Sequence, residues 1–414
     1  MVKLHRYISI SMSGRKDITM RAATDNGTFT IYLDGRIDST NAPDVEKEIL
    51  ELAQQRGENS LVLDIENLAY ISSAGLRVLM KLRKTQQETL TVLGASPEVY
   101  DIFETTGFTE LLDVHKRLRE LDVTDCPVIG QGGNGTIYRL DEDTIVKVYK
   151  PWIGLAQVDR ERAYARTAFV NGIPSVIAYD TVKCGDSLGV VFEMLKSDTL
   201  GHAMRDEPDR LEEYAEKHVA LAKTLHSTHV PTGSFERIQD VYHRLAGNLD
   251  KWCSKEEISL LHSIIDDIPE TDTVTHNDLH PGNIMIQDGE LLLIDMPEVT
   301  VGPPVCDLIA IYRDMVSGPS GKEKGHIEQS VGMPAEQIIK ARNLFFAGYT
   351  GITDPDALKA YYEKLGLLYA FNVSLVPGSG SEKAMQLAPV IMENLFKRVV
   401  IPNEQAIRAL FKTM

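Results

Sequence analysis

The residues most able to do chemistry in this 414-residue chain lie in VTHNDLHPGNIMI (274–286) and in the apolar run that follows it. His276, Asp278 and Asn283 are spaced as H-x-D-x-x-x-x-N, and Asp295 ends the apolar run. Carboxylate and amide oxygens are ligands that suit Mg²⁺ beside the phosphates of a nucleotide. The pattern predicts that Asn283 and Asp295 hold the metal while Asp278 orients or deprotonates an acceptor hydroxyl.

A glycine-rich stretch, VIGQGGNGTIYRLDEDTIVKVYK (128–150), lies upstream of these residues. Gly130, Gly132 and Gly135 read G-x-G-x-x-G, but a dinucleotide-binding turn would open a helix, and here strand-like residues follow. We expect a flap of two strands whose backbone amides approach phosphates, because glycine has no side chain in the way. Lys147, on the second strand, would then be the cation on the phosphates; an exposed strand lysine is the alternative.

Two further segments could complete a nucleotide site. The helical pattern at 158–172 carries Glu161, which is placed to pair with the lysine of the flap, although a solvated helix glutamate explains it nearly as well. The apolar run SLGVVFEML (187–195) predicts a strand leading into an adenine-binding segment. There, backbone groups of Glu193 and Leu195 would contact the base.

Taken together, these motifs resemble the protein-kinase-like superfamily, and within it the aminoglycoside phosphotransferase and choline kinase branch. HNDLHPGN has a second histidine, His280, where protein kinases usually have lysine, and IDMPEV lacks their Phe-Gly after the aspartate. The resemblance implies an α+β bilobal fold with a β-rich N-lobe and a mostly helical C-lobe, and it implies ATP and Mg²⁺ as cofactors. It also implies that His276 and Asp307, in CDLIAIY, support the catalytic loop.

The N-terminal part of the chain alternates expected strands and helices, which indicates a small α/β layer domain. The strands are expected at 28–34, 60–65 and 89–94, and the helices at 41–55, 73–84 and 96–107. LVLDIENLAYISSAGLRVLMKL, with GRIDSTNAP before it and FETTGF after it, resembles the core of a STAS domain, the anti-sigma factor antagonist fold.

In that family a serine at the start of the second helix is phosphorylated by a partner kinase, and the phosphate controls binding to that partner. Counting back from Gly75, Ser73 is the first candidate phosphoacceptor and Ser72 the second; Ala74 departs from the family pattern. The residues alone favour Ser73 as the helix N-cap. A phosphate at the positive end of a helix would be compatible with that position.

The composition of the chain indicates which classes of partner it can bind and where it is located. The net charge of −17 argues against nonspecific binding to nucleic acid or to an anionic membrane, which needs a basic surface. The four cysteines are scattered and lack metal-ligand spacing, so reduced thiols in a cytoplasmic protein are expected. No apolar run reaches the length of a membrane span or of a secretory signal.

We therefore expect two folded parts with connecting segments: an N-terminal extension at 1–18, a STAS domain at 19–117, a linker at 118–125, a kinase-like N-lobe at 126–196 and a C-lobe at 197–414. The predicted function is ATP- and Mg²⁺-dependent phosphoryl transfer to a hydroxyl, of a small molecule or of a protein serine such as Ser73, coupled to the STAS domain. The alternative is a nucleotide-sensing regulator that works by binding an anti-sigma factor-like partner.

Overall fold

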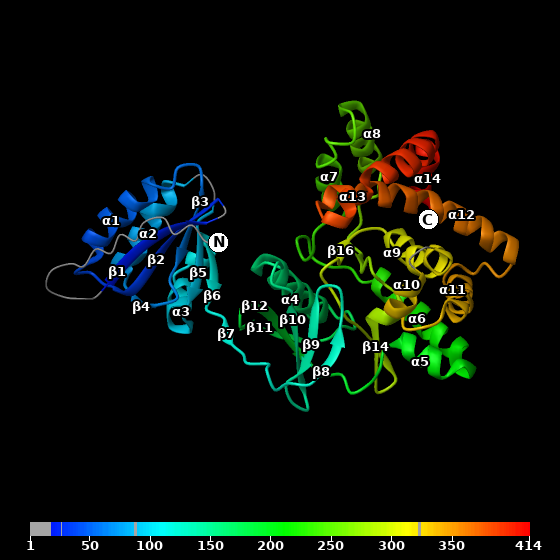
Figure 1. The fold of residues 1–414 in the computed structure, drawn as a ribbon, viewed down its shortest axis with the longest axis horizontal. Coiled ribbons are helices and arrows are strands. Elements are labelled where there is room, and N and C mark those ends of the chain that lie inside the picture. Colours follow the sequence, from blue (N-terminus) through cyan, green and yellow to red (C-terminus); the bar gives the residue numbers. More distant parts are fainter. Residues whose placement is uncertain (1–17, 26, 87–88, 322–323) are drawn as a thin grey trace. The chain divides into compact units, whose positions relative to one another are not determined.

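The chain divides into two compact units, Met1–Glu120 and Leu121–Met414 (Figure 1). The structure is a computed structural model that describes residues 18–25, 27–86, 89–321 and 324–414. The predicted linker at 118–125 includes the boundary between the units and the short strand β7 (Arg119–Glu120). Within the described ranges, no helix has both the length and the apolar character needed to cross a bilayer.

The first unit is built on a mixed sheet. β1 (Ile18–Asp25) runs antiparallel to β2 (Thr28–Ile37). The strands that follow are parallel to one another and extend the sheet from β2: β3 (Ser60–Asp64), β5 (Thr91–Ala95) and β6 (Asp113–Lys116), with β4 (Leu68–Ile71) paired to the end of β2. Parallel neighbours need crossover connections, and helices supply them here.

The helices of the first unit are α1 (Ala42–Gln54), α2 (Ser73–Lys84) and α3 (Pro97–Thr105), followed by the short η1 (Phe108–Glu110). Their apolar faces meet the sheet: Val45, Ile49 and Leu52 of α1 are buried with strand residues in one core. The three predicted helices and three predicted strands of this part are confirmed, whereas β1, β4 and β6 were not predicted. Residues 1–17 of the expected extension lie outside the described residues, and Ile18 already belongs to β1.

The second unit begins with an antiparallel sheet. Its strands follow the order β11 (Ala178–Cys184), β12 (Ser187–Glu193), β10 (Thr144–Tyr149), β9 (Gly135–Arg139) and β8 (Val128–Gln131). Helix α4 (Leu155–Val170) packs against β11 and β12. β10 coincides with the TIVKVY strand expected from the sequence, so Lys147 lies on a strand beside the glycine turn.

The rest of the second unit is mostly helical. Its helical elements are α5 (Leu200–Asp206), η2 (Pro208–Arg210), α6 (Leu211–His226), α7 (Ile238–Gly247), α8 (Lys255–Asp266), η3 (Pro281–Asn283), α9 (Val305–Ile311), η4 (Tyr312–Ser317), η5 (Gly318–Ser320), α10 (Lys324–Val331), α11 (Ala335–Thr350), α12 (Pro355–Leu375), η6 (Val376–Ser379), α13 (Glu382–Ile391), η7 (Met392–Val400), η8 (Ile401–Asn403) and α14 (Glu404–Thr413). Two short antiparallel pairs are formed by β13 (Val274–Thr275) with β16 (Thr300–Val301) and by β14 (Ile284–Gln287) with β15 (Glu290–Leu293).

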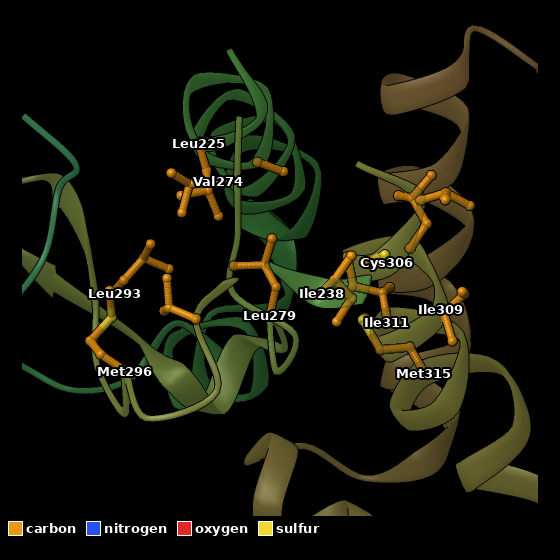
Figure 2. Packing of buried hydrophobic residues seen from close by; sticks show 14 of the residues in the cluster. Leu225, Ile238, Val274, Leu279, Leu293, Met296, Cys306, Ile309, Ile311 and Met315 are labelled. Atoms are coloured by element: carbon orange, nitrogen blue, oxygen red, sulfur yellow. The ribbon is translucent and has the colours of Figure 1, made fainter. Parts of the chain in front are cut away.

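A cluster of buried apolar side chains holds the segment 274–286, which contains Asp278 and Asn283. Figure 2 shows Val274 and Leu279 of this segment packed among apolar side chains from α6, α7 and α9. Leu279 is fully buried and lies between Asp278 and His280 in the sequence. Because the side chain of Leu279 is held in the core, the polar residues on either side of it have fixed positions.

Candidate active site

Lys147, on β10, bridges two carboxylates. Its Nζ donates to Glu161 Oε1 of α4 at 2.7 Å and to Asp295 Oδ1, just beyond β15, at 2.8 Å. The Lys147 side chain is 15% exposed, so it is not an exposed strand lysine. Burial opposes its charge, but Asp295 and Glu161 outweigh burial and raise the pKa of the Lys147 ammonium. The lysine is therefore a cation at neutral pH.

Asp278 and Asn283 contact each other across the tight loop between β13 and β14. Asn283 Nδ2 donates to Asp278 Oδ2 at 2.7 Å and to the Asp278 carbonyl oxygen at 3.0 Å. Asn283 lies in η3 and is buried. Because the amide nitrogen is used by Asp278, the amide oxygen is the atom of Asn283 with which it could bind a cation.

Asp307, on α9, holds the start of this loop. It is fully buried, and its carboxylate accepts the backbone N–H of His276 at 2.9 Å and that of Asn277 at 2.5 Å. Its Oδ2 also lies 2.9 Å from His226 Nε2, and His226 Nδ1 lies 2.7 Å from Tyr349 Oη. Asp307 thus has the supporting position expected for it, while His226 was not identified from the sequence.

Two residues near the site, one in this loop and one in the turn after β15, adopt backbone conformations that non-glycine residues seldom adopt. Asn277 has φ 62° and Asp295 has φ 61°. Side chains hold both positions: Asn277 Nδ2 donates to the Glu298 carbonyl oxygen at 2.8 Å, and His276 Nε2 lies 3.0 Å from the Ile294 carbonyl oxygen. His276 therefore connects the loop of Asp278 to the turn that presents Asp295, which is a supporting role.

Gly130 and Gly135 permit strands to pack closely. A Cβ at position 135 would lie 2.3 Å from the Val148 carbonyl oxygen of the neighbouring strand. A Cβ at position 130 would lie 3.3 Å from Ile137 Cδ1. The structure therefore explains these two glycines by the packing of neighbouring strands, whereas the sequence argument explained them by the close approach of a phosphate.

The turn between β8 and β9 leaves other amides available. The Gly132 N–H donates to the Gly135 carbonyl oxygen at 2.9 Å and is used within the turn. Within the described residues, the N–H groups of Gly133 and Asn134 donate no hydrogen bond, and a Cβ at position 133 would meet open space. The amides of Gly133 and Asn134, which the sequence motif did not select, are therefore the better candidates for contact with an anion.

The end of β12 has one available backbone donor rather than two. The Glu193 N–H donates to the Ile177 carbonyl oxygen at 3.0 Å, and Glu193 Oε1 accepts the Ile177 N–H at 2.7 Å. The Leu195 N–H donates no hydrogen bond in the part of the chain that the structure describes. Of the two predicted base-binding residues, Leu195 thus retains a donor, and Glu193 has its N–H occupied.

Arg313, on η4, is a member of the site that sequence reasoning missed. Its Nη2 contacts Asp278 Oδ1 and lies 2.7 Å from Asp314 Oδ2. Burial would raise the pKa of Asp278, but His280 and Arg313 outweigh burial and lower it, so Asp278 is ionised at neutral pH. The signal in the sequence is the charged pair RD directly after the apolar run that contains Asp307.

Part of this set lines one cleft of about 770 Å³ within the second unit. Its lining includes Asp278, Asp295, Arg313 and Asp314, with Glu298 and Arg160 among the other charged residues. The carboxylates of Asp278 and Asp314 and a nitrogen of His280 lie within 4.8 Å of one another. Because Arg313 already contacts both carboxylates, its guanidinium supplies the cation of this cluster.

The donor set of the cleft fits Mg²⁺. Asp295 offers a carboxylate that is 37% exposed, and Asn283 offers its amide oxygen, and both are hard oxygen ligands of the kind that Mg²⁺ takes. Mg²⁺ retains several waters and shares phosphates, so two protein ligands are enough. The residues present therefore fit the predicted ion.

Ser72 and Ser73, the two candidate phosphoacceptors, differ in their position at the start of α2. Ser72 is the N-cap of α2, and its Oγ accepts the Gly75 N–H at 3.3 Å. Ser73 is the first residue of the helix and is exposed. The expectation that Ser73 caps the helix is wrong, because the backbone enters the helix one residue earlier. Both serines belong to the first unit, and the residues that line the cleft belong to the second.

Comparison with known families defines the class of the protein. Residues 125–342, a little over half of the chain, match the model of the phosphotransferase enzyme family, and the chain belongs to that family. Residues 19–121 match the STAS domain model. The protein is a kinase-like phosphotransferase with an N-terminal STAS domain, and the predicted resemblance and fold class are confirmed.

Relatives of known description match the STAS region. A Bordetella bronchiseptica protein assigned as an anti-sigma factor antagonist, BtrV, is 39% identical over 93 residues, which are 22% of this chain and 78% of that protein. The anti-sigma-B factor antagonist of Listeria monocytogenes is 31% identical over 93 residues, covering 22% of this chain and 81% of that protein. The first unit is therefore similar to proteins that consist largely of this one domain.

Solved structures give a more distant likeness. An aminoglycoside phosphotransferase in a ternary complex with streptomycin and ATP is 15% identical, with a TM-score of 0.42, over 72% of this chain and 96% of that one. A choline/ethanolamine kinase family protein from Mesorhizobium loti is 13% identical, with a TM-score of 0.41, over 70% of this chain and 92% of that one. The family assignment rests on the sequence matches.

Proposed function

We propose that the second unit transfers the γ-phosphoryl group of ATP, with Mg²⁺, to the hydroxyl of an acceptor. The observation that carries this proposal is the bridge from Lys147 to Glu161 and Asp295. Asp295 lines the same cleft as Asp278, which is the partner of Asn283. Phosphoryl transfer uses a cation for the phosphates, ligands for a metal ion and a carboxylate for the acceptor hydroxyl. Lys147 is the cation, Asn283 and Asp295 are the ligands, and Asp278 is the carboxylate.

Each side chain has a role that follows from its contacts. Lys147, held as a cation by Glu161 and Asp295, would pair with phosphate oxygens. Mg²⁺, held by Asn283 and Asp295, would neutralise charge on the phosphates when bound. The amides of Gly133 and Asn134 and the N–H of Leu195 would bind the two ends of the nucleotide.

Asp278 would accept a hydrogen bond from the acceptor hydroxyl and orient it toward the phosphorus. Its pKa is lowered because His280 and Arg313 outweigh the effect of burial, so the carboxylate is ionised but a weak base. A loose, metaphosphate-like transition state requires little proton transfer before the new bond forms. Positioning of the hydroxyl is therefore the main contribution of Asp278 in this proposal.

Asp278→Asn in the full-length protein tests the proposal. Wild-type protein and the variant are assayed for ATP binding and for phosphoryl transfer with Mg²⁺, against amino alcohols, sugars, aminoglycosides and a STAS fragment. We expect the variant to bind ATP with unchanged affinity and to lose transfer by about 10³-fold. Equal turnover by the two proteins, or no nucleotide binding by either, would contradict the proposal.

A second candidate function concerns the STAS domain. We propose that it binds an anti-sigma factor-like partner and that phosphorylation of Ser73, or of Ser72, weakens this binding. The names of the relatives that match this domain, and the exposure of Ser73 at the start of α2, support this proposal. A cytoplasmic location, also proposed, agrees with the four cysteines, all among the described residues, being free thiols.

Mass spectrometry of the 70–79 peptide, after incubation with Mg²⁺ and ATP, shows whether this chain modifies its own serines. Phosphate on Ser73 in the wild type but not in Asp278→Asn would assign the acceptor to the chain itself. Partner capture that depends on nucleotide but not on Asp278 would instead favour a regulator that senses nucleotide without transferring phosphate.

A further inference from the structure

Two histidines outside the catalytic cleft meet nitrogen to nitrogen on the packed helices α7 and α8. His243 Nδ1 of α7 lies 2.7 Å from His262 Nδ1 of α8. The ring centroids are 4.9 Å apart and the ring planes are inclined by 25°. Because the nitrogens are much closer than the centroids, they lie between the two rings. The two Nδ1 atoms therefore point toward each other along nearly one line.

A carboxylate lies beside the second nitrogen of one of these rings. His243 Nε2 lies 3.1 Å from Asp266 Oδ1. Asp266 is four residues after His262, so the two share one face of α8. An imidazole that donates Nε2–H to a carboxylate has its lone pair on Nδ1, and metal-bound histidines usually have such a partner on their second nitrogen.

We propose that His243 and His262 bind a divalent transition-metal cation through their Nδ1 atoms, with Asp266 orienting His243. Imidazole nitrogen is a preferred ligand of Zn²⁺, Ni²⁺ and Cu²⁺, whereas Mg²⁺ prefers oxygen. Without a metal, one proton between the nitrogens makes their hydrogen bond. With the metal, that proton moves to His262 Nε2, and both Nδ1 atoms donate lone pairs to the cation while waters complete its coordination.

The site needs a small adjustment to accept the cation. Tetrahedral coordination with bonds of 2.0–2.1 Å places two ligand nitrogens about 3.3 Å apart. The present hydrogen bond is shorter than that, so the rings must separate by roughly half an ångström. Both side chains are half-buried, which leaves room for rotation.

Metal titration of the full-length protein tests the site independently of phosphotransferase activity. The protein is stripped with a chelator and kept in excess Mg²⁺, so that oxygen ligands in the cleft are occupied by the harder ion. In calorimetric titrations with Ni²⁺, Cu²⁺ and Zn²⁺, the protein should bind one equivalent of each ion tightly, with the highest affinity for Cu²⁺. Absence of such an equivalent for all three ions would overturn the proposal and leave a hydrogen-bonded pair.

Substitutions show which residues bind this equivalent of metal. His262→Gln and His243→Gln should each weaken it at least about ten-fold, and Asp266→Asn should weaken it by about ten-fold through the orientation of His243. His229→Gln is the matched control, because His229 Nδ1 lies 2.6 Å from Asp272 Oδ1 and His229 is not a member of the histidine pair. Melting temperature without metal confirms that each variant is folded. Retained affinity in His262→Gln, or equal loss in His229→Gln, would place the metal elsewhere and overturn the proposal.

Discussion

At the scale of single residues, the cleft is defined by charges that neutralise one another. Lys147 pairs with Glu161 and Asp295, and Arg313 pairs with Asp278 and Asp314. Removing one member of a buried pair leaves its partner without compensation, which costs more than the pair itself contributes. The effects of substitution should therefore reach beyond the residue that is changed.

Lys147→Met should weaken the binding of ATP and reduce transfer to an acceptor by about 10²-fold or more, because the variant loses the cation that Glu161 and Asp295 hold in the cleft. Nucleotide affinity and single-turnover transfer measure the two effects. Lys150→Met is a control on the same segment, since Lys150 lies over the Trp152 ring instead. An equal effect of both substitutions would argue against a specific role for Lys147.

Arg313→Ala should lower kcat by about 10²-fold while leaving the affinity for ATP nearly unchanged, because the substitution frees Asp278 to move without touching Lys147 or Asp295. Arg313→Lys should restore part of the activity, since an ammonium can still contact one of the carboxylates. Steady-state kinetics and nucleotide binding separate the two quantities. A loss confined to ATP affinity would contradict the positioning role.

At the scale of elements, the start of α2 depends on one serine and one glycine. Ser72 caps the helix, and a Cβ at Gly75 would lie 2.7 Å from both Ile37 Cγ2 and Ile71 Cγ1. The helix can approach the sheet at this point only because residue 75 has no side chain. This close approach places the start of α2 and explains the glycine of the SSAGL segment physically.

Ser72→Ala should destabilise the first unit by about 1 kcal/mol through loss of the cap, whereas Ser73→Ala should have little effect on stability. Denaturant unfolding of the two variants measures the difference. The pair also separates the roles of the serines, because Ser73→Ala removes the proposed phosphoacceptor without removing the cap. Greater destabilisation by Ser73→Ala would contradict the observed helix start.

A second prediction at this scale concerns acid. Asp267, after α8, accepts Lys412 Nζ at 2.7 Å and pairs with Arg408, both on α14, and hydrogen bonds from these two residues lower its pKa. A folded-state pKa below the unfolded value means that the stabilisation is present at neutral pH and is lost as pH falls through the folded pKa. Asp267→Asn should lower the melting temperature at pH 7, and the difference from wild type should shrink below about pH 4.

At the scale of the whole molecule, the two compact units should respond separately to ligands. Saturating ATP with Mg²⁺ should raise the melting transition of the second unit by several degrees, since a ligand at about 100 times its Kd stabilises a protein by about 2.7 kcal/mol. Scanning calorimetry measures both transitions, and Ser72→Ala identifies that of the first unit. A nucleotide-dependent shift of the STAS transition would show that the units are coupled.

The sequence predicted much of the fold and the composition of the site, because both leave local patterns. Helical spacing of apolar residues and basic residues in the last turn predicted α2, and TIVKVY predicted β10. The spacing of Asp278, Asn283 and Asp295 predicted residues that the fold brings into one cleft or into contact with it. It did not predict Arg313 or His226, whose partners lie 35 and 81 positions away. The RD pair at 313–314 marks a charged position but does not indicate the contact of Arg313 with Asp278.

Several details were decided by tertiary structure. The sequence determined that phosphate-handling motifs and a serine-led helix occur in one chain, since spacing and residue type are local properties. Which serine caps α2 was decided by where the backbone turns, and that depends on packing of Gly75 against the neighbouring Ile71 and the distant Ile37. Which amides of the glycine turn are available was decided by pairing between strands. Contacts between segments that are far apart in the sequence determine the capping serine and the available amides. No short stretch of sequence records those contacts.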